Sequence, residues 1–271
     1  MRTLIVGIAR SGTSALYFKL KQALPNTTWC LFEPPRFDPS DPGASADVLA
    51  KIVIGPPDDF DYTSFRAFDK KVMIVRDPRD NVVSRLLYGP CATEVFRKDK
   101  AKVAVFIRAL LCKEADPRSV SVLDLIELFY HLIGRKLAVR PSALHDLALD
   151  FHRTNNDFFV CKYEDFIAGR YAAVENYLGI ELPGGDADVT AQYEHVVRTK
   201  AANDWKNWFT ADDVAEFQPR LSSFMSAYGY PDDWLLAEEP SLCPQHGSEF
   251  VRRSFAMRNR PEQDLAGSRA A

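Results

Sequence analysis

The chain has 271 residues, of which 46% are hydrophobic and 26% are charged, a balance typical of soluble globular proteins. Its 34 Lys and Arg residues face 37 Asp and Glu residues, and the net charge of −3 argues against general attraction to nucleic acid or to an anionic membrane. The five cysteines are scattered and form no Cys-x-x-Cys pair, so we expect reduced thiols and neither a disulfide framework nor a structural zinc site.

No segment of the sequence has the pattern of a membrane span or of a secretion signal. A span needs roughly 20 apolar residues in a row, and no stretch of this chain approaches that length. The apolar run over residues 4–8 is too short for the core of a signal peptide. The sequence therefore predicts a cytoplasmic protein without a transmembrane segment, and it gives no indication of the oligomeric state.

Strands and helices alternate along the first ninety residues, as judged from apolar runs, helical spacing and prolines. In chain order we expect a strand over 2–9, a helix from 14 to Pro25, a strand over 29–32, a proline-rich loop over 34–42, a strand over 72–75 and a helix over 80–88. Strands that alternate with helices through short turns favour a mainly parallel sheet with helices on both faces.

The rest of the chain is mostly helical in pattern. We expect a helical block over 94–153 with breaks near Pro117 and at Pro141, a strand over 158–162, and helices over 171–178 and 212–228. Residues 236–271 mix Pro, Ser, Gly and Arg and are predicted to form a flexible tail after one domain over 1–235. The predicted fold class is α/β, with three layers around a mainly parallel sheet.

The most informative segment lies between the first strand and the first helix, from Gly7 to Ser14. N–H groups of such a loop and of the following helix N-terminus receive phosphate groups. The spacing of Gly7 and Gly12 fits the nucleotide-binding loop Gly-x-x-x-x-Gly-Lys-Ser/Thr, but Thr13 replaces its lysine, which disfavours an ordinary kinase or ATPase. A plain tight turn is the structural alternative.

Three segments in the expected order resemble the sulfotransferases that use 3′-phosphoadenosine 5′-phosphosulfate. Residues 10–14 (Arg-Ser-Gly-Thr-Ser) resemble the phosphosulfate loop of that family, and residues 75–84 (Val-Arg-Asp-Pro-Arg-Asp-Asn-Val-Val-Ser) its 3′-phosphate motif. Residues 198–210 resemble its carboxy-terminal motif, Arg-Lys-Gly-x-x-Gly-Asp-Trp-Lys-Asn-x-Phe-Thr. The resemblance extends over about residues 2–230 and implies a fold like that of the P-loop nucleotide-binding proteins.

The resemblance also implies a donor, a product and a set of binding residues. The donor is 3′-phosphoadenosine 5′-phosphosulfate, the product is adenosine 3′,5′-bisphosphate, and no metal is required. A strand-end arginine and a hydroxyl in the next helix can converge on a phosphate dianion, which suits Arg76 and Ser84. The implied donor-binding residues are Arg10, Ser11, Gly12, Thr13, Ser14, Arg76, Ser84, Arg198, Thr199 and Lys200.

Two residues are candidates for the chemistry itself. Arg10 stays protonated, so we assign it stabilisation of the charge that grows on the departing 5′-phosphate. Glu33 follows a strand in the string Leu-Phe-Glu-Pro, which is similar to one in carbohydrate and some bacterial sulfotransferases, and is the candidate base for the acceptor. A solvated glutamate before a proline-rich loop is the alternative. Cytosolic members instead use a histidine, and the corresponding stretch of this chain, residues 51–57, contains no histidine.

Several departures from the family leave the acceptor open. Ala15 stands where cytosolic members carry a Trp that stacks on adenine, and Thr199 and Lys200 replace Lys and Gly of the carboxy-terminal motif. We expect the acceptor to be a small molecule, a glycan or a lipid with a hydroxyl group, and no nucleic acid is expected as a partner. A divergent nucleotide kinase and a non-catalytic nucleotide-binding scaffold protein are the rival functions.

Overall fold

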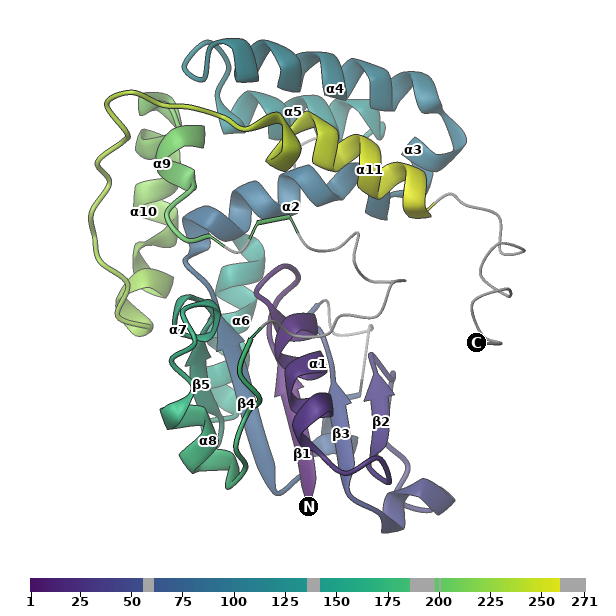
Figure 1. The fold of residues 1–271 in the computed structure, drawn as a ribbon. Coiled ribbons are helices and arrows are strands. Elements are labelled where there is room, and N and C mark those ends of the chain that lie inside the picture. The colour runs from purple at the N-terminus through teal and green to yellow at the C-terminus, as the bar shows by residue number, and fades with distance from the viewer. Residues whose placement is uncertain (56–60, 136–141, 186–197, 200, 259–271) are drawn as a thin grey trace. The chain divides into compact units, whose positions relative to one another are not determined.

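The computed structural model describes residues 1–55, 61–135, 142–185, 198–199 and 201–258, and these residues are coloured in Figure 1. The chain divides into two compact units. The first unit consists of Met1–Asn81, Pro141–Val189 and Arg220–Asp232, and the second of Val82–Arg140, Thr190–Pro219 and Asp233–Ala271.

The first unit is built on a five-stranded sheet in the order β2-β3-β1-β4-β5. All neighbouring strands are parallel, which confirms the predicted α/β class. Parallel strands with both faces covered are rich in branched apolar residues, and Leu4, Ile5 and Val72 are fully buried. The strands are β1 (Arg2–Val6), β2 (Trp29–Phe32), β3 (Val48–Lys51), β4 (Lys70–Val75) and β5 (Phe159–Lys162).

Helices lie on both sides of this sheet. In Figure 1, α1 (Thr13–Ala23) lies in front of the strands and α6 (Ala143–Thr154) behind them. Tyr228, at the end of α10, donates a hydrogen bond to Met73 Sδ of β4 and stacks on His152 of α6. The remaining helices of the first unit are η1 (Pro42–Ser45), η2 (Tyr62–Phe65), α7 (Tyr163–Ile167) and α8 (Ala172–Leu178).

The second unit is helical in its described residues, and the boundary between the units falls inside α2 and α10. Phe96 and Phe129 stack at 5.4 Å between ring centroids, and Phe106 packs edge-on against both rings. The helices are α2 (Pro78–Ala92), α3 (Glu94–Lys98), α4 (Lys100–Ala115), α5 (Val122–Leu132), α9 (Trp205–Trp208), α10 (Ala211–Ala227), η4 (Pro244–His246) and α11 (Ser248–Arg258).

β3 and the carboxy-terminal segment differ from the sequence prediction. The strand β3 was not expected, because its four residues Val-Leu-Ala-Lys are all buried and show no alternation. The tail predicted over 236–271 contains α11, in which Phe250 and Val251 are fully buried and Glu114 binds the N–H and hydroxyl of Ser248. Only two large apolar residues carry the inward face of α11, which is too weak a pattern to recognise. Residues 259–271 lie outside the described part.

Candidate donor site

The loop between β1 and α1 requires its two glycines. A Cβ at Gly7 would lie 2.5 Å from Ser11 Oγ and 2.6 Å from the carbonyl oxygen of Ile74. Gly12 has a φ of +103°, and a Cβ there would lie 2.5 Å from the Tyr163 ring. The glycines therefore allow the loop to pass close to β4 and to Tyr163 before α1 begins, and the N-terminus of α1 is a favourable place for an anion.

Polar groups of the predicted phosphate loop are held inside it. Ser11 is 1% exposed, and its Oγ has no hydrogen-bond partner among the described residues. Arg10 has a φ of +69°, a left-handed conformation that costs energy for a residue with a Cβ. A buried hydroxyl without a partner and a strained arginine in one short loop are features of a ligand site.

The second motif is tied to this loop by two hydrogen bonds. Arg76 follows β4 and donates from Nη1 to the carbonyl oxygen of Arg10 at 3.3 Å. Asn81 donates from its side-chain amide to the carbonyl oxygen of Ala9 at 3.0 Å. The structure thus brings the end of β4 and the start of α2 against the loop.

The side chain of Arg76 is buried, and part of its guanidinium has no hydrogen-bond partner among the described residues. It is 6% exposed, and its guanidinium carbon lies 4.6 Å from the centroid of the Tyr163 ring. Its Nε and Nη2 have no hydrogen-bond partner within the described residues. A buried guanidinium with unused donors is costly unless an anion satisfies it, so Arg76 marks a site for a negatively charged group.

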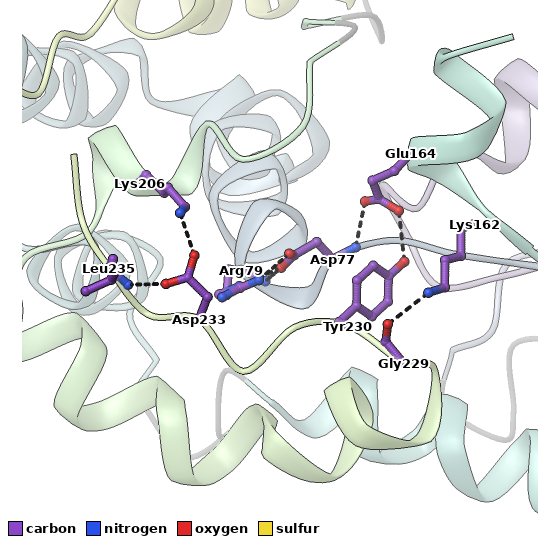
Figure 2. A network of polar contacts seen from close by, with 9 residues as sticks. All are labelled: Asp77, Arg79, Lys162, Glu164, Lys206, Gly229, Tyr230, Asp233 and Leu235. Atoms are coloured by element: carbon purple, nitrogen blue, oxygen red, sulfur yellow. Dashed lines mark hydrogen bonds and ion pairs between the residues drawn. The ribbon is translucent and has the colours of Figure 1, made fainter. Parts of the chain in front are cut away.

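A polar network holds the residues next to Arg76 (Figure 2). Asp77 binds Arg79 through two side-chain contacts, at 2.9 and 2.7 Å, and its N–H donates to Glu164 Oε1 at 2.9 Å. Tyr230 donates its hydroxyl proton to Glu164 Oε2 at 2.9 Å. Sequence reasoning gave no role to Arg79 or Glu164. The available signal was their position, because Arg79 lies three residues after Arg76 and Glu164 comes just after the strand β5.

Glu33, the candidate base, is held by Lys51. Its carboxylate forms an ion pair with Lys51 Nζ, and its N–H donates to the carbonyl oxygen of Lys51 at 2.7 Å. Glu33 has a φ of +54°, and its side chain is 49% exposed, whereas that of Lys51 is 2% exposed. Because β3 lies between β2 and β1, Glu33 is separated from the phosphate loop by the strand that ends at Lys51.

Lys51 is a functional candidate that sequence reasoning missed, although a lysine inside a short apolar stretch was a usable signal. Its Nζ lies 4.2 Å from the centroid of the Phe32 ring. Burial lowers the pKa of Lys51 below its usual value, while the negative charge of Glu33 opposes that shift. The ion pair fixes the carboxylate of Glu33 at the end of the sheet where parallel strands gather functional groups.

The remaining predicted donor residues belong to the second unit. Arg198 is 6% exposed and binds Asp204 Oδ2 at 2.8 Å, and its Nε and Nη2 lack partners in the described ranges. Asn203 has a φ of +64°, a conformation that favours the glycine of the family motif and that Asn tolerates. Ser84 is buried in α2 and Thr199 is half-buried. Lys200 lies outside the described residues.

No metal cluster and no membrane helix are found in the part of the chain that the structure describes. None of its His, Cys, Asp and Glu side chains form a group of three or more that could hold a metal ion. None of its helices is both long and apolar enough to cross a bilayer.

The parallel sheet with a phosphate loop after β1 is the fold of the sulfotransferases. The chain is similar to the crystal structure of the mouse sulfotransferase SULT7A1 complexed with PAP, with a TM-score of 0.50, 16% sequence identity and coverage of 83% of this chain and 84% of that chain. The sulfotransferase fold expected from the three motifs is therefore confirmed.

A second similar structure is retinol dehydratase in complex with androsterone and the inactive cofactor PAP. Its TM-score is 0.44 and its identity 14%, over 83% of this chain and 80% of that chain. No family model and no curated protein sequence matches the chain. The likeness to the mouse sulfotransferase is thus one of structure, and it shows the fold.

Proposed function

We propose that the chain is a sulfotransferase that moves a sulfuryl group from 3′-phosphoadenosine 5′-phosphosulfate to a hydroxyl group of an acceptor. Arg76 is the observation that carries this proposal. Its buried guanidinium lies beside a phosphate loop, its only described hydrogen bond is to a neutral carbonyl oxygen, and two of its nitrogens have no partner in the described residues. A 3′-phosphate dianion would supply the missing acceptors and the opposite charge.

The donor's two phosphate groups are assigned to different residues. The 5′-phosphosulfate is assigned to Arg10 and to the loop residues Ser11, Gly12, Thr13 and Ser14, where the N-terminus of α1 and the Ser11 hydroxyl are favourable to an anion. The 3′-phosphate is assigned to Arg76 and Ser84, and its motif assigns Arg198 to the same group, with Thr199 and Lys200 beside it in sequence.

Glu33 is the proposed base for the acceptor hydroxyl. The bound donor supplies a sulfuryl group joined to a phosphate that can leave. As the acceptor oxygen forms its bond to sulfur, its proton passes to the carboxylate of Glu33, and the bond between sulfur and the 5′-phosphate oxygen breaks. Arg10 and the loop N–H groups stabilise the charge left on that phosphate, so this scheme needs no metal ion. The ion pair with Lys51 keeps the Glu33 carboxylate in one place.

Calorimetry with adenosine 3′,5′-bisphosphate and adenosine 5′-monophosphate, without added metal, tests the donor assignment. We expect the wild type to prefer the bisphosphate and Arg76→Ala to lose about 10- to 100-fold in bisphosphate affinity, because a lost charged contact costs roughly 1.5–3 kcal/mol. Arg66→Ala, at an exposed arginine of the same unit, is the matched control and should bind like the wild type. Equal binding of the two nucleotides by the wild type would contradict the proposal.

A second measurement separates the enzyme from its rivals. Labelled phosphosulfate is offered with sugar, lipid and small natural-product hydroxyls as acceptors, and transfer to one of these classes supports the enzyme. Tight binding of the bisphosphate with no transfer to any of them favours a scaffold protein. Magnesium-dependent ATP hydrolysis, without a preference for the bisphosphate, favours a kinase.

A further inference from the structure

Arg76 is followed in the chain by a buried acid, Asp77, to which a second acid, Glu164, is hydrogen-bonded. Asp77 is its neighbour in sequence and is 4% exposed, and Glu164 binds the N–H of Asp77. Either carboxylate is an obvious partner for a buried guanidinium, because unlike charges attract strongly away from water. Yet Nε and Nη2 of Arg76 have no partner among the described residues. Both acids are instead bound by other residues.

Asp77 is fully engaged by Arg79. Asp77 Oδ1 accepts from Arg79 Nε and from the Arg79 N–H, both at 2.9 Å, and Oδ2 accepts from Nη2 at 2.7 Å. Arg79 is 2% exposed, so the pair is shielded from solvent, and its forked geometry is the strongest that an arginine offers a carboxylate. Figure 2 shows both nitrogens of the fork directed at the Asp77 carboxylate.

Glu164 is satisfied without any cation in this network. Its two oxygens accept from the N–H of Asp77 and from the hydroxyl of Tyr230 (Figure 2). Burial raises the pKa of Glu164 above its usual value, and the nearby Asp77 charge acts in the same direction. The acid next to Asp77 is therefore held by neutral donors, and the positive charge of Arg76 is not consumed by it.

We propose that Arg79 is a positioning residue that keeps Asp77 from pairing with Arg76 and so preserves Arg76 for the 3′-phosphate. This inference rests on the proposed function. Without Arg79, the buried Asp77 carboxylate would lack its counter-charge, and the guanidinium of Arg76 is the adjacent group that can replace it. An Arg76 neutralised by Asp77 has less charge and fewer donors to offer a phosphate, so the preference for the 3′-phosphate falls.

Three variants test this inference with adenosine 3′,5′-bisphosphate and adenosine 5′-monophosphate as the probes: Arg79→Met, Asp77→Asn and the double variant Arg79→Met/Asp77→Asn. Arg79→Met should reduce the ratio of the two affinities by about tenfold, the size of one charged contact. Asp77→Asn should keep the wild-type ratio, since Asn also serves at a helix N-terminus. The double variant should return to within about threefold of the wild type, because position 77 then carries no acid to capture Arg76 and Glu164 keeps its neutral donor Tyr230.

The double variant tests whether Arg79 acts through Asp77 even where Arg79→Met does not fold, because it buries no unpaired carboxylate at position 77. A folded double variant that has lost the preference would show that Arg79 itself is needed, and the inference would be overturned. An unchanged preference in a folded Arg79→Met would overturn it as well. A wild type with no preference for the bisphosphate would instead contradict the proposed function. Failure of the proposed function and failure of the inference about Arg79 are therefore distinguishable.

Discussion

The ends of β4 and β2 hold their charged side chains in opposite ways. Arg76, after β4, is buried against a carbonyl oxygen and an aromatic ring, both of them neutral. Glu33, after β2, is half-exposed and paired with the buried ammonium of Lys51. A buried charge without a counter-charge is suited to binding an ion, whereas a half-exposed carboxylate can be reached by a molecule that approaches from solvent.

Arg198 of the second unit combines the two patterns. It is as buried as Arg76 and likewise has two nitrogens without partners among the described residues, but Asp204 already neutralises part of its charge. Under the proposed function, we therefore expect Arg76 to contribute more than Arg198 to the binding of the donor.

The largest expected effect is that of replacing Glu33, the acidic residue of the two strand ends compared above. Glu33→Gln removes the proton acceptor, so turnover should fall by about 10²- to 10⁴-fold, as for the loss of a general base. The affinity for adenosine 3′,5′-bisphosphate should stay at the wild-type level in calorimetry. Glu181→Gln, at an exposed glutamate of the same unit, is the control. A Glu33→Gln enzyme with normal turnover would remove Glu33 from the mechanism.

The next effect sharpens the ranking of the two arginines. Arg76→Leu should cost about 10- to 100-fold in bisphosphate affinity, and Arg198→Leu less than tenfold, because Asp204 has already weakened the field of Arg198. Titration calorimetry of both variants with the bisphosphate gives the ratio. A larger loss in Arg198→Leu would reverse the ranking and mean that the Asp204 pair does not screen the charge.

A smaller effect concerns the turn that follows Arg198. Asn203→Ala should lower the free energy of unfolding by about 1 kcal/mol, since the left-handed region is costly for alanine, while Asn203→Gly should leave it within a few tenths. Urea unfolding of the two variants measures the difference. Equal stabilities would show that the turn relaxes to another conformation.

The smallest effect is a change in the pH dependence of stability at Lys51. The pKa of Lys51 is lowered from 10.5 by burial, so the folded chain releases this proton at a lower pH than the unfolded chain does. Between the lowered pKa and 10.5 the unfolded chain binds more protons, and stability from this group rises with pH. The wild type should therefore gain stability relative to Lys51→Met as the pH rises through that window. Parallel curves in thermal unfolding would contradict this.

The proposed donor residues of the first unit could be named from the sequence because they lie in short contiguous segments. The loop from Gly7 to Ser14 and the strand end at Arg76 are each recognisable alone, and parallel sheet topology brings them to one edge. The sulfotransferase fold and the parallel sheet followed from the same segments.

The partners of these residues were not predictable, since they come from distant parts of the chain. Tyr163 and Tyr230 reach the neighbourhood of Arg76 only through tertiary packing, and Lys51 meets Glu33 only because the unrecognised β3 lies next to β2.

The contact between Gly12 and Tyr163 has a consequence for the order in which the site is made. The sequence of the phosphate loop is complete once residue 14 has been synthesised, but the ring that presses on Gly12 and lies under Arg76 is 151 positions further along the chain from Gly12. A ribosome that has released only β1 to β4 presents a loop without its packing surface. The packing of this loop in the first unit is thus completed late in translation, although the loop's own residues are among the first to emerge.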